Sequence, residues 1–139
     1  MEHTFYLKIL SANRVFFAGK CQSLIVPEYD GQKEILAYHE DMVIAVCEGE
    51  MRFRPENSNE WQYAVIGTGF VQIANNRVLL LVETAEHPNE IDIARAREAK
   101  ERAEEQLRQK QSMQEYYHSS ASLARAMSRL KVADKKYSI

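Results

Sequence analysis

The chain changes character near residue 88, and this change limits the folds that are open to it. All five glycines lie before residue 70 and the last proline is Pro88, so the rest lacks the two residues that most often interrupt a helix. The charge changes at the same place. Residues 1–87 carry 7 Lys and Arg against 12 Asp and Glu, whereas residues 88–139 carry 11 against 8. We therefore predict two domains, at residues 1–87 and 88–139.

The first part consists of short apolar runs separated by Gly, Asn, Asp and Pro. Residues 5–9, FYLKI, alternate in polarity, which is the pattern of a half-buried strand. Similar runs recur up to residue 84. The pair Asn75-Asn76 lies between two of them and favours a tight hairpin, because Asn tolerates positive φ. These features predict an all-β domain of antiparallel strands, a sandwich or a barrel.

The second part predicts an α-helical hairpin. Asn89 follows Pro88 as a candidate N-cap, and residues up to about Lys110 are mostly strong helix formers. The capping-box spacing from Ser112 to Glu115 predicts a second helix that begins near Met113. Its expected apolar stripe comprises Tyr116, Leu123, Met127 and Leu130, and residues 131–139 are expected to fray.

The apolar face of the first predicted helix is thin. It consists of Ile91, Ala96, Ala99, Ala103 and Leu107. Alanine buries little surface, and burial contributes only ~25 cal/mol per Å². We therefore expect a hairpin that is weakly held and can detach from its folded arrangement.

Composition and motifs argue against an enzyme that acts alone. The net charge of −2 gives no general attraction to nucleic acid or to anionic lipid. The four histidines have no metal-ligand spacing, and the chain lacks phosphate-binding glycine loops and the G-x-S-x-G motif. Cys21 and Cys47 lie in separate apolar runs and are expected to be free, buried thiols, with a disulfide or a reactive thiol as the alternative.

Arginines of the predicted hairpin form the one candidate binding site. Asp92 and Arg95 are three residues apart, and Arg102 lies seven residues beyond Arg95 on nearly the same helix face. On the second helix, Arg125 and Arg129 are neighbours at i, i+4. If the hairpin closes, four guanidinium groups could converge on a phosphate. The alternative is an ordinary solvated face, in which Asp92 only neutralises the first helical turn and pairs with Arg95.

A series of short motifs runs along nearly the whole chain. They are Phe5–Ile9, Phe17–Gly19, Leu24–Pro27, Asp30-Gly31, Ile35-Leu36 before His39, Gly69-Phe70, Asn75–Val78, Glu83–Glu86 and Ile91–Ala96. In their order and spacing, these motifs resemble the epsilon subunit of bacterial F-type ATP synthase. The resemblance implies a β-sandwich over residues 1–87 and a regulatory hairpin over residues 88–139. It also implies a non-catalytic rotor subunit that couples proton-driven rotation to ATP synthesis.

The resemblance further implies partners and a place in the cell. The sandwich would bind the gamma subunit and rest on the c-ring, with His39 at this interface. The hairpin would extend toward the catalytic beta and alpha subunits and oppose ATP hydrolysis. The net positive charge of residues 88–139 is consistent with this role. The chain would lie at the cytoplasmic face of the bacterial membrane, attached through the complex.

In some bacterial relatives the folded hairpin binds ATP through the signature I-D-x-x-R-A, which here is Ile91-Asp92-Ile93-Ala94-Arg95-Ala96. The accompanying residues match Glu86, Arg102, Arg125 and Arg129. The resemblance thus implies that Asp92 and Glu86 act around the adenine or order the arginines, while the four arginines meet the phosphates. ATP would be a regulatory ligand that is not hydrolysed. A subunit whose tail does not bind nucleotide, and a free-standing β-sandwich interaction module, remain alternatives.

Overall fold

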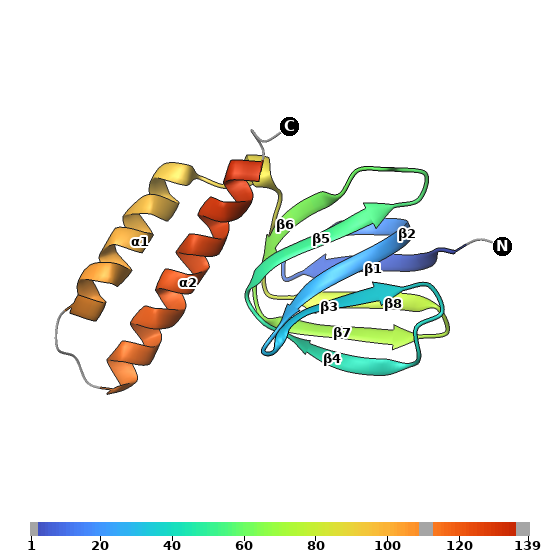
Figure 1. Cartoon of the computed structure of the whole chain (residues 1–139), viewed down its shortest axis with the longest axis horizontal. Helices are drawn as coiled ribbons and strands as arrows, with labels where there is room; N and C mark the ends of the chain where they lie inside the picture. Colours follow the sequence, from blue (N-terminus) through green and yellow to red (C-terminus); the bar gives the residue numbers. More distant parts are fainter. Residues whose placement is uncertain (1–2, 109–112, 136–139) are drawn as a thin grey trace. The chain divides into compact units, whose positions relative to one another are not determined.

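The computed structural model describes residues 3–108 and 113–135, except for the side chains of residues 113–118. Two compact units make up the chain, Met1–Glu86 and His87–Ile139. The first is built of strands and the second of helices (Figure 1). The predicted fold class, an all-β domain followed by a helical hairpin, is confirmed.

Nine strands form the sheet in the described part of the first unit. They are β1 (Phe5–Ser11), β2 (Arg14–Glu28), β3 (Gly31–Leu36), β4 (Met42–Val46), β5 (Gly49–Pro55), β6 (Gln62–Ile66), β7 (Gly69–Ala74), β8 (Arg77–Val82) and β9 (Ala85–Glu86). Their order in space is β4-β7-β8-β1-β2-β5-β6-β9, and β3 pairs with β2. The strands pair antiparallel except for β1 and β8. Strands β1 and β8, which lie far apart in the sequence, pair parallel.

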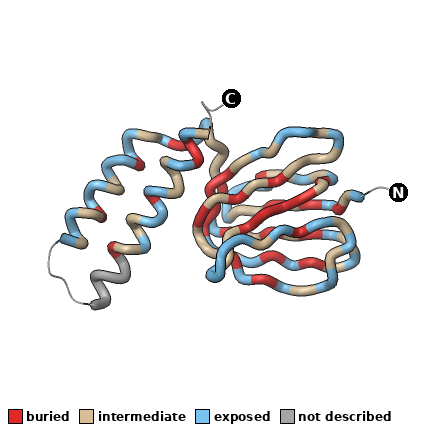
Figure 2. The backbone as a smooth tube through the Cα atoms, in the orientation of Figure 1, coloured by how far each residue is buried: buried red, intermediate tan, exposed pale blue. Residues whose placement is uncertain are grey.

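Strand β2 connects two layers of the sandwich. Its first half pairs with β1, from Arg14 to Cys21, and its second half pairs with β3 and β5, up to Glu28. The inward-facing residues of both layers form one core, which includes Phe5, Leu24, Phe53 and Leu80. Figure 2 shows buried positions recurring along the strands. This alternation is the one that residues 5–9 predicted, and it explains why the β unit can be recognised from its sequence.

The loop between β3 and β4 is fastened to the hairpin between β7 and β8. Asn75 and Asn76 both have positive φ, 51° and 59°, and join the paired residues 74 and 77, so the predicted tight hairpin is confirmed. The side-chain oxygen of Asn76 accepts a hydrogen bond from the Tyr38 backbone N–H at 2.7 Å, and its amide nitrogen donates to the Thr4 carbonyl at 2.9 Å. Tyr38, with φ of 62°, is thereby held in a left-handed conformation that a bulky residue rarely adopts.

The second unit begins with a short 3₁₀ helix, η1 (Pro88–Glu90), and continues with α1 (Ile93–Arg108) and α2 (Met113–Lys135). The two helices lie side by side and antiparallel (Figure 1). Buried positions on α1 are Ala96 and Ala103. Among the described side chains of α2, residues 119–135, the buried ones are Ser119, Ala126, Val132 and Ala133. The expected thin alanine face of α1 is confirmed, and α2 also presents mainly small residues.

Three details of the predicted helices are wrong. Asn89 lies within η1, and α1 begins three residues later, after Asp92. Met127 is 50% exposed and therefore no part of a buried stripe. Small residues spaced by seven, such as Ala126 and Ala133, take the buried positions because they let two helices approach closely. Residues 131–135 are helical rather than frayed, and Val132 is fully buried. The predicted capping box from Ser112 lies outside the described residues.

Candidate functional site

The start of α1 shows what the signature Ile91–Ala96 does in this fold. The Asp92 side-chain oxygen Oδ1 accepts a hydrogen bond from the backbone N–H of Arg95 at 3.1 Å, and the Asp92 carbonyl accepts from the N–H of Ala96 at 3.0 Å. This is the geometry of an N-cap residue. Ile91 is buried, and its N–H donates to the Pro88 carbonyl at 3.4 Å. An aspartate three residues before an arginine is therefore explained first as a helix start.

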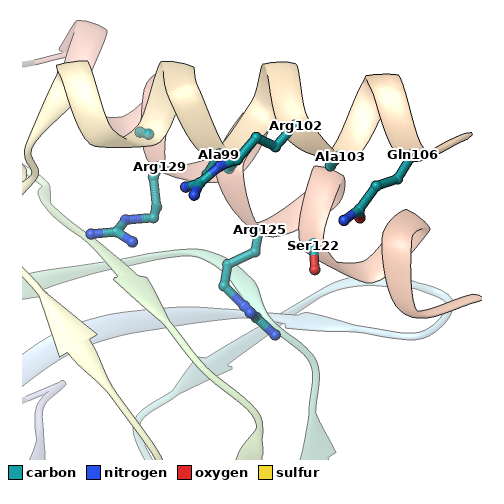
Figure 3. Close-up of a pocket in the computed structure, with 9 residues that line it drawn as sticks. Ala99, Arg102, Ala103, Gln106, Ser122, Arg125 and Arg129 are labelled. Carbon is teal, nitrogen blue, oxygen red and sulfur yellow. The ribbon is translucent and has the colours of Figure 1, made fainter. Parts of the chain in front are cut away.

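A cavity of about 320 Å³ lies between α1 and α2 (Figure 3). Its lining residues come from both helices and are of three kinds: small apolar residues, arginines and neutral polar residues. They are Ala96, Ala99, Arg102, Ala103 and Gln106 of α1, and Ser122, Arg125, Ala126 and Arg129 of α2. This volume lies at the lower end of the range of small-molecule sites.

The alanines are the reason that the cavity exists. Ala96, Ala103 and Ala126 are almost completely buried, between 1% and 3% exposed. Their methyl groups close the contact between the helices but leave the space beside them unfilled. The thin apolar face thus has two consequences: it holds the helices together weakly, and it leaves room for a ligand.

Three guanidinium groups give the cavity a positive potential. Arg102 comes from α1, and Arg125 and Arg129 come from α2 (Figure 3). Like charges on facing helices repel each other, and an anion between them removes this cost. Each guanidinium carries a planar fork of N–H donors that matches phosphate or carboxylate oxygens. The arrangement is therefore suited to an anion with several oxygens.

Only part of the predicted residue set lines this cavity. Ala96, Arg102, Arg125 and Arg129 do so, whereas Ile91, Asp92 and Arg95 lie at the start of the hairpin, outside the lining. The Arg95 side chain is exposed. Glu86 lies in the first unit, in β9, where it pairs with Val65. His39 lies in the β3–β4 loop, and its Nδ1 is 2.8 Å from the carbonyl oxygen of Glu40.

Sequence reasoning missed two polar residues of the cavity, Gln106 and Ser122. Gln106 follows Arg102 by four residues and Ser122 precedes Arg125 by three, so each lies near an arginine of its own helix, but this spacing does not show whether either residue faces the other helix. The Ser119 hydroxyl donates a hydrogen bond to Gln106 Oε1 at 3.0 Å and so connects the two helices. Ser119 is 2% exposed. Neither serine gave a signal without knowledge of which face of α2 meets α1.

Other charged residues of α1 behave as an ordinary solvated surface. Glu104 lies within 3.9 Å of Lys100 and within 3.6 Å of Arg108, which also contacts Glu105 at 3.1 Å. Such exposed pairs contribute little to stability. Among the side chains of residues 3–108 and 119–135, no three His, Cys, Asp or Glu gather as a metal site. Within the same ranges, no helix has the length and apolar character needed to cross a membrane.

Cys21 and Cys47 are free cysteines, as expected. Cys21 is fully buried, and burial raises the pKa of its thiol to about 12. Cys47 is only half-buried, which differs from the expectation. Desolvation and then the nearby Glu28 raise the pKa of its thiol. Both thiols are therefore held in the neutral, poorly nucleophilic form at neutral pH.

Comparison with known families gives matches over both units. The sequence model of the ATP synthase delta/epsilon chain beta-sandwich domain matches residues 4–88, and that of the long alpha-helix domain of the same chain matches residues 89–134. The ATP synthase epsilon chain of Ruminiclostridium cellulolyticum is 42% identical over 96% of this chain and 98% of the relative. That of Caldanaerobacter subterraneus is also 42% identical, over 97% of each chain.

Solved structures share the fold at low sequence identity. A chain of the Euglena gracilis mitochondrial ATP synthase, in an assembly of OSCP, F1 and c-ring, superposes with a TM-score of 0.73 at 16% identity, covering 99% of this chain and 81% of its own. A chain of the Tetrahymena thermophila mitochondrial ATP synthase central stalk and c-ring gives 0.65 at 12% identity, covering 94% of each chain.

Proposed function

This chain belongs to the ATP synthase delta/epsilon family, and on this premise we propose that it is the epsilon subunit of the central stalk of a proton-translocating F-type ATP synthase. Relatives with this name match it over almost their full lengths, 98% and 97%, which supports the same role for the whole chain. It is an accessory subunit that helps couple rotation to ATP synthesis and catalyses no reaction by itself.

The proposed partners are the gamma subunit and the c-ring for the sandwich, and the catalytic beta and alpha subunits for the hairpin. The two similar solved chains come from assemblies that include the c-ring or the central stalk, which supports this placement. The β3–β4 loop, with His39, is a rigid element suited to an interface because Asn76 fixes the neighbouring Tyr38. Through the complex, the chain lies at the cytoplasmic face of the bacterial membrane.

We further propose that the folded hairpin binds ATP as a regulatory ligand. The observation that carries this proposal is the cavity lined by Arg102, Arg125 and Arg129. Arginine forks would meet the phosphates, and the adenine would lie toward the start of α1, near Asp92. Asp92 can cap the helix through Oδ1 and still accept from the adenine amino group through its second oxygen. No hydrolysis is expected, since the lining offers neither a carboxylate base nor metal ligands.

ATP binding would make the hairpin a sensor of ATP concentration. The ligand binds only the closed pair of helices and stabilises it by RT ln(1 + [L]/Kd). The interface beneath it consists largely of alanines and Ser119, which contribute little burial energy. When ATP falls, the open hairpin gains population, extends toward the catalytic subunits and opposes ATP hydrolysis.

Calorimetric titration of the isolated chain with ATP tests nucleotide binding. Replacing Arg102 or Arg125 with alanine should weaken binding at least tenfold, because each removes a charge-assisted hydrogen bond from a phosphate. Arg97, which is exposed on α1 and does not line the cavity, provides the matched control Arg97→Ala. The thermal transition of the sandwich should be the same in all three variants. Equal weakening by Arg97→Ala would refute a specific site.

One observation favours the alternative of a tail that does not bind nucleotide: Asp92 already has a complete structural role as the cap of α1. In that case the arginines serve only protein contacts, and the folded chain gives no heat at millimolar ATP. Co-purification with gamma then tests the remaining assignment. Failure of a folded chain to bind gamma would support a free-standing interaction module instead.

A further inference from the structure

Gln106 and Ser122 lie together at one end of the cavity. Ala96 lines the opposite end of the α1 wall, ten residues earlier, so the wall spans about 15 Å at 1.5 Å per residue. The arginines line the region between, with Arg102 one turn before Gln106 and Arg125 one turn after Ser122. The cavity is therefore elongated along the helices, with a cationic middle and a neutral polar end.

The hydrogen bond with Ser119 sets the orientation of the Gln106 amide. Ser119 donates to Oε1, so the oxygen is occupied and the NH₂ group, with its two N–H donors, remains for another partner. Figure 3 shows Gln106 projecting from α1, with its nitrogen on the side of Ser122 and Arg102. The Ser122 hydroxyl can add a third donor from α2.

These donors can bind an anionic oxygen without adding a fourth positive charge. None of the described residues that line the cavity carries a carboxylate, so nothing there repels an anion. A phosphate chain that starts at the Ala96 end and passes between the arginines directs its last phosphoryl group toward Gln106 and Ser122. A shorter chain engages the arginines and leaves this end empty.

We propose that Gln106 and Ser122 form a subsite for the terminal phosphoryl group of a nucleoside triphosphate, and that they make the cavity distinguish triphosphates from diphosphates. This inference rests on the proposed nucleotide binding. Because Gln106 is hydrogen-bonded to Ser119 of the other helix, a phosphate on its NH₂ group also fixes the contact between the helices. The closed hairpin then responds to the third phosphate as well as to the nucleotide.

The test compares ATP and ADP binding to the full chain by calorimetry. Gln106→Leu and Ser122→Ala should each raise the Kd for ATP about tenfold, the value of a hydrogen bond to a charged group, and change the Kd for ADP less than twofold. Ser128→Ala on α2, which does not line the cavity, should change neither. Helix content measured by circular dichroism confirms that each variant retains the hairpin.

Gln106→Glu separates ligand contact from a structural role. A glutamate retains an oxygen that accepts from Ser119, so with a purely structural role the ATP-to-ADP affinity ratio stays as in the wild type. A carboxylate beside the terminal phosphate should instead weaken ATP binding roughly a hundredfold by charge repulsion, and ADP binding much less.

Each outcome decides between the two proposals. If the wild-type chain is folded but binds no ATP, nucleotide binding fails and the subsite fails with it. If ATP binds normally but the ATP-to-ADP affinity ratio is the same in the wild type, Gln106→Leu and Gln106→Glu, only the subsite is refuted. A parallel loss of ATP and ADP affinity also refutes the subsite, because it shows that Gln106 acts only on the hairpin as a whole.

Discussion

Replacement of Asp92 tests whether this residue acts through the helix start or through its charge. Asp92 Oδ1 is 3.1 Å from the backbone nitrogen of Arg95, and loss of such a cap costs about 1 kcal/mol. Asp92→Ala should therefore destabilise the folded hairpin by this amount. Asp92→Asn should leave it nearly unchanged, because asparagine caps a helix as well as aspartate does.

The expected loss of stability is large compared with the packing energy that holds this hairpin closed. The buried positions of α1 are two alanines, Ala96 and Ala103, so little packing energy offsets the loss. A change of 1 kcal/mol alters the ratio of closed to open hairpin about fivefold. Hydrogen exchange of the first amides of α1 should accelerate about fivefold in Asp92→Ala. If the hairpin is mostly open without ligand, the apparent Kd for ATP should rise by at least this factor, because Asp92→Ala also removes the proposed contact with the adenine.

Amide exchange followed by NMR or mass spectrometry, together with ATP titration, provides the assay. Glu98→Ala serves as the control, since Glu98 is exposed on α1 and lies outside the first turn. Equal acceleration in Asp92→Ala and Asp92→Asn would show that the negative charge, and not the cap, stabilises the helix. Unchanged exchange in Asp92→Ala would show that the observed hydrogen bond contributes nothing.

Two further predictions concern the sandwich. Asn76→Ala should lower its free energy of unfolding by about 2–3 kcal/mol, because Asn76 forms hydrogen bonds with both Tyr38 and Thr4 and has φ of 59°. Asn76→Gly should recover about 1 kcal/mol of this loss. Equal urea midpoints for the two variants would refute the role of backbone strain. The raised pKa of Cys21, about 12 against an ordinary 9.0, means that between these values the unfolded chain releases the thiol proton while the folded chain keeps it. Stability should thus fall with rising pH by up to about 1.4 kcal/mol per unit through this thiol, and Cys21→Ala should lack this contribution.

The degree to which the sequence predicts the fold differs between the two units. In the sandwich, the alternation of apolar and polar residues predicts the strands, because one face of each strand is buried. Two runs, residues 14–17 and 21–27, nevertheless belong to one strand, β2. It continues through Gly19 because β1 pairs with its first half, from Arg14 to Cys21. On α2, Met127 was expected inside and is exposed. The hydrophobic pattern gives the wrong prediction there because the two helices pack closely, and close packing places small residues rather than large apolar ones at the buried positions.

For the candidate site, residue types could be predicted and their grouping could not. Arginines at helical spacing indicated an anion site and included Arg102, Arg125 and Arg129, which line the cavity. Arg95 and Asp92 belong to the same pattern but lie at the helix start. Spacing alone cannot separate a cap from a ligand contact, since both require a carboxylate at the same position of a helix. Gln106 and Ser122 gave no signal because their role depends on the facing helix.

The amino-acid sequence by itself determined the division of this protein into a β unit and a basic helical hairpin, since polarity periods and the distribution of glycine and proline act locally along the chain. The tertiary structure alone decided which faces of α1 and α2 meet. That choice depends on how the small side chains of two helices pack against each other, which the local pattern of neither helix specifies. It is what creates the arginine-lined cavity and places Gln106 and Ser122 at its end.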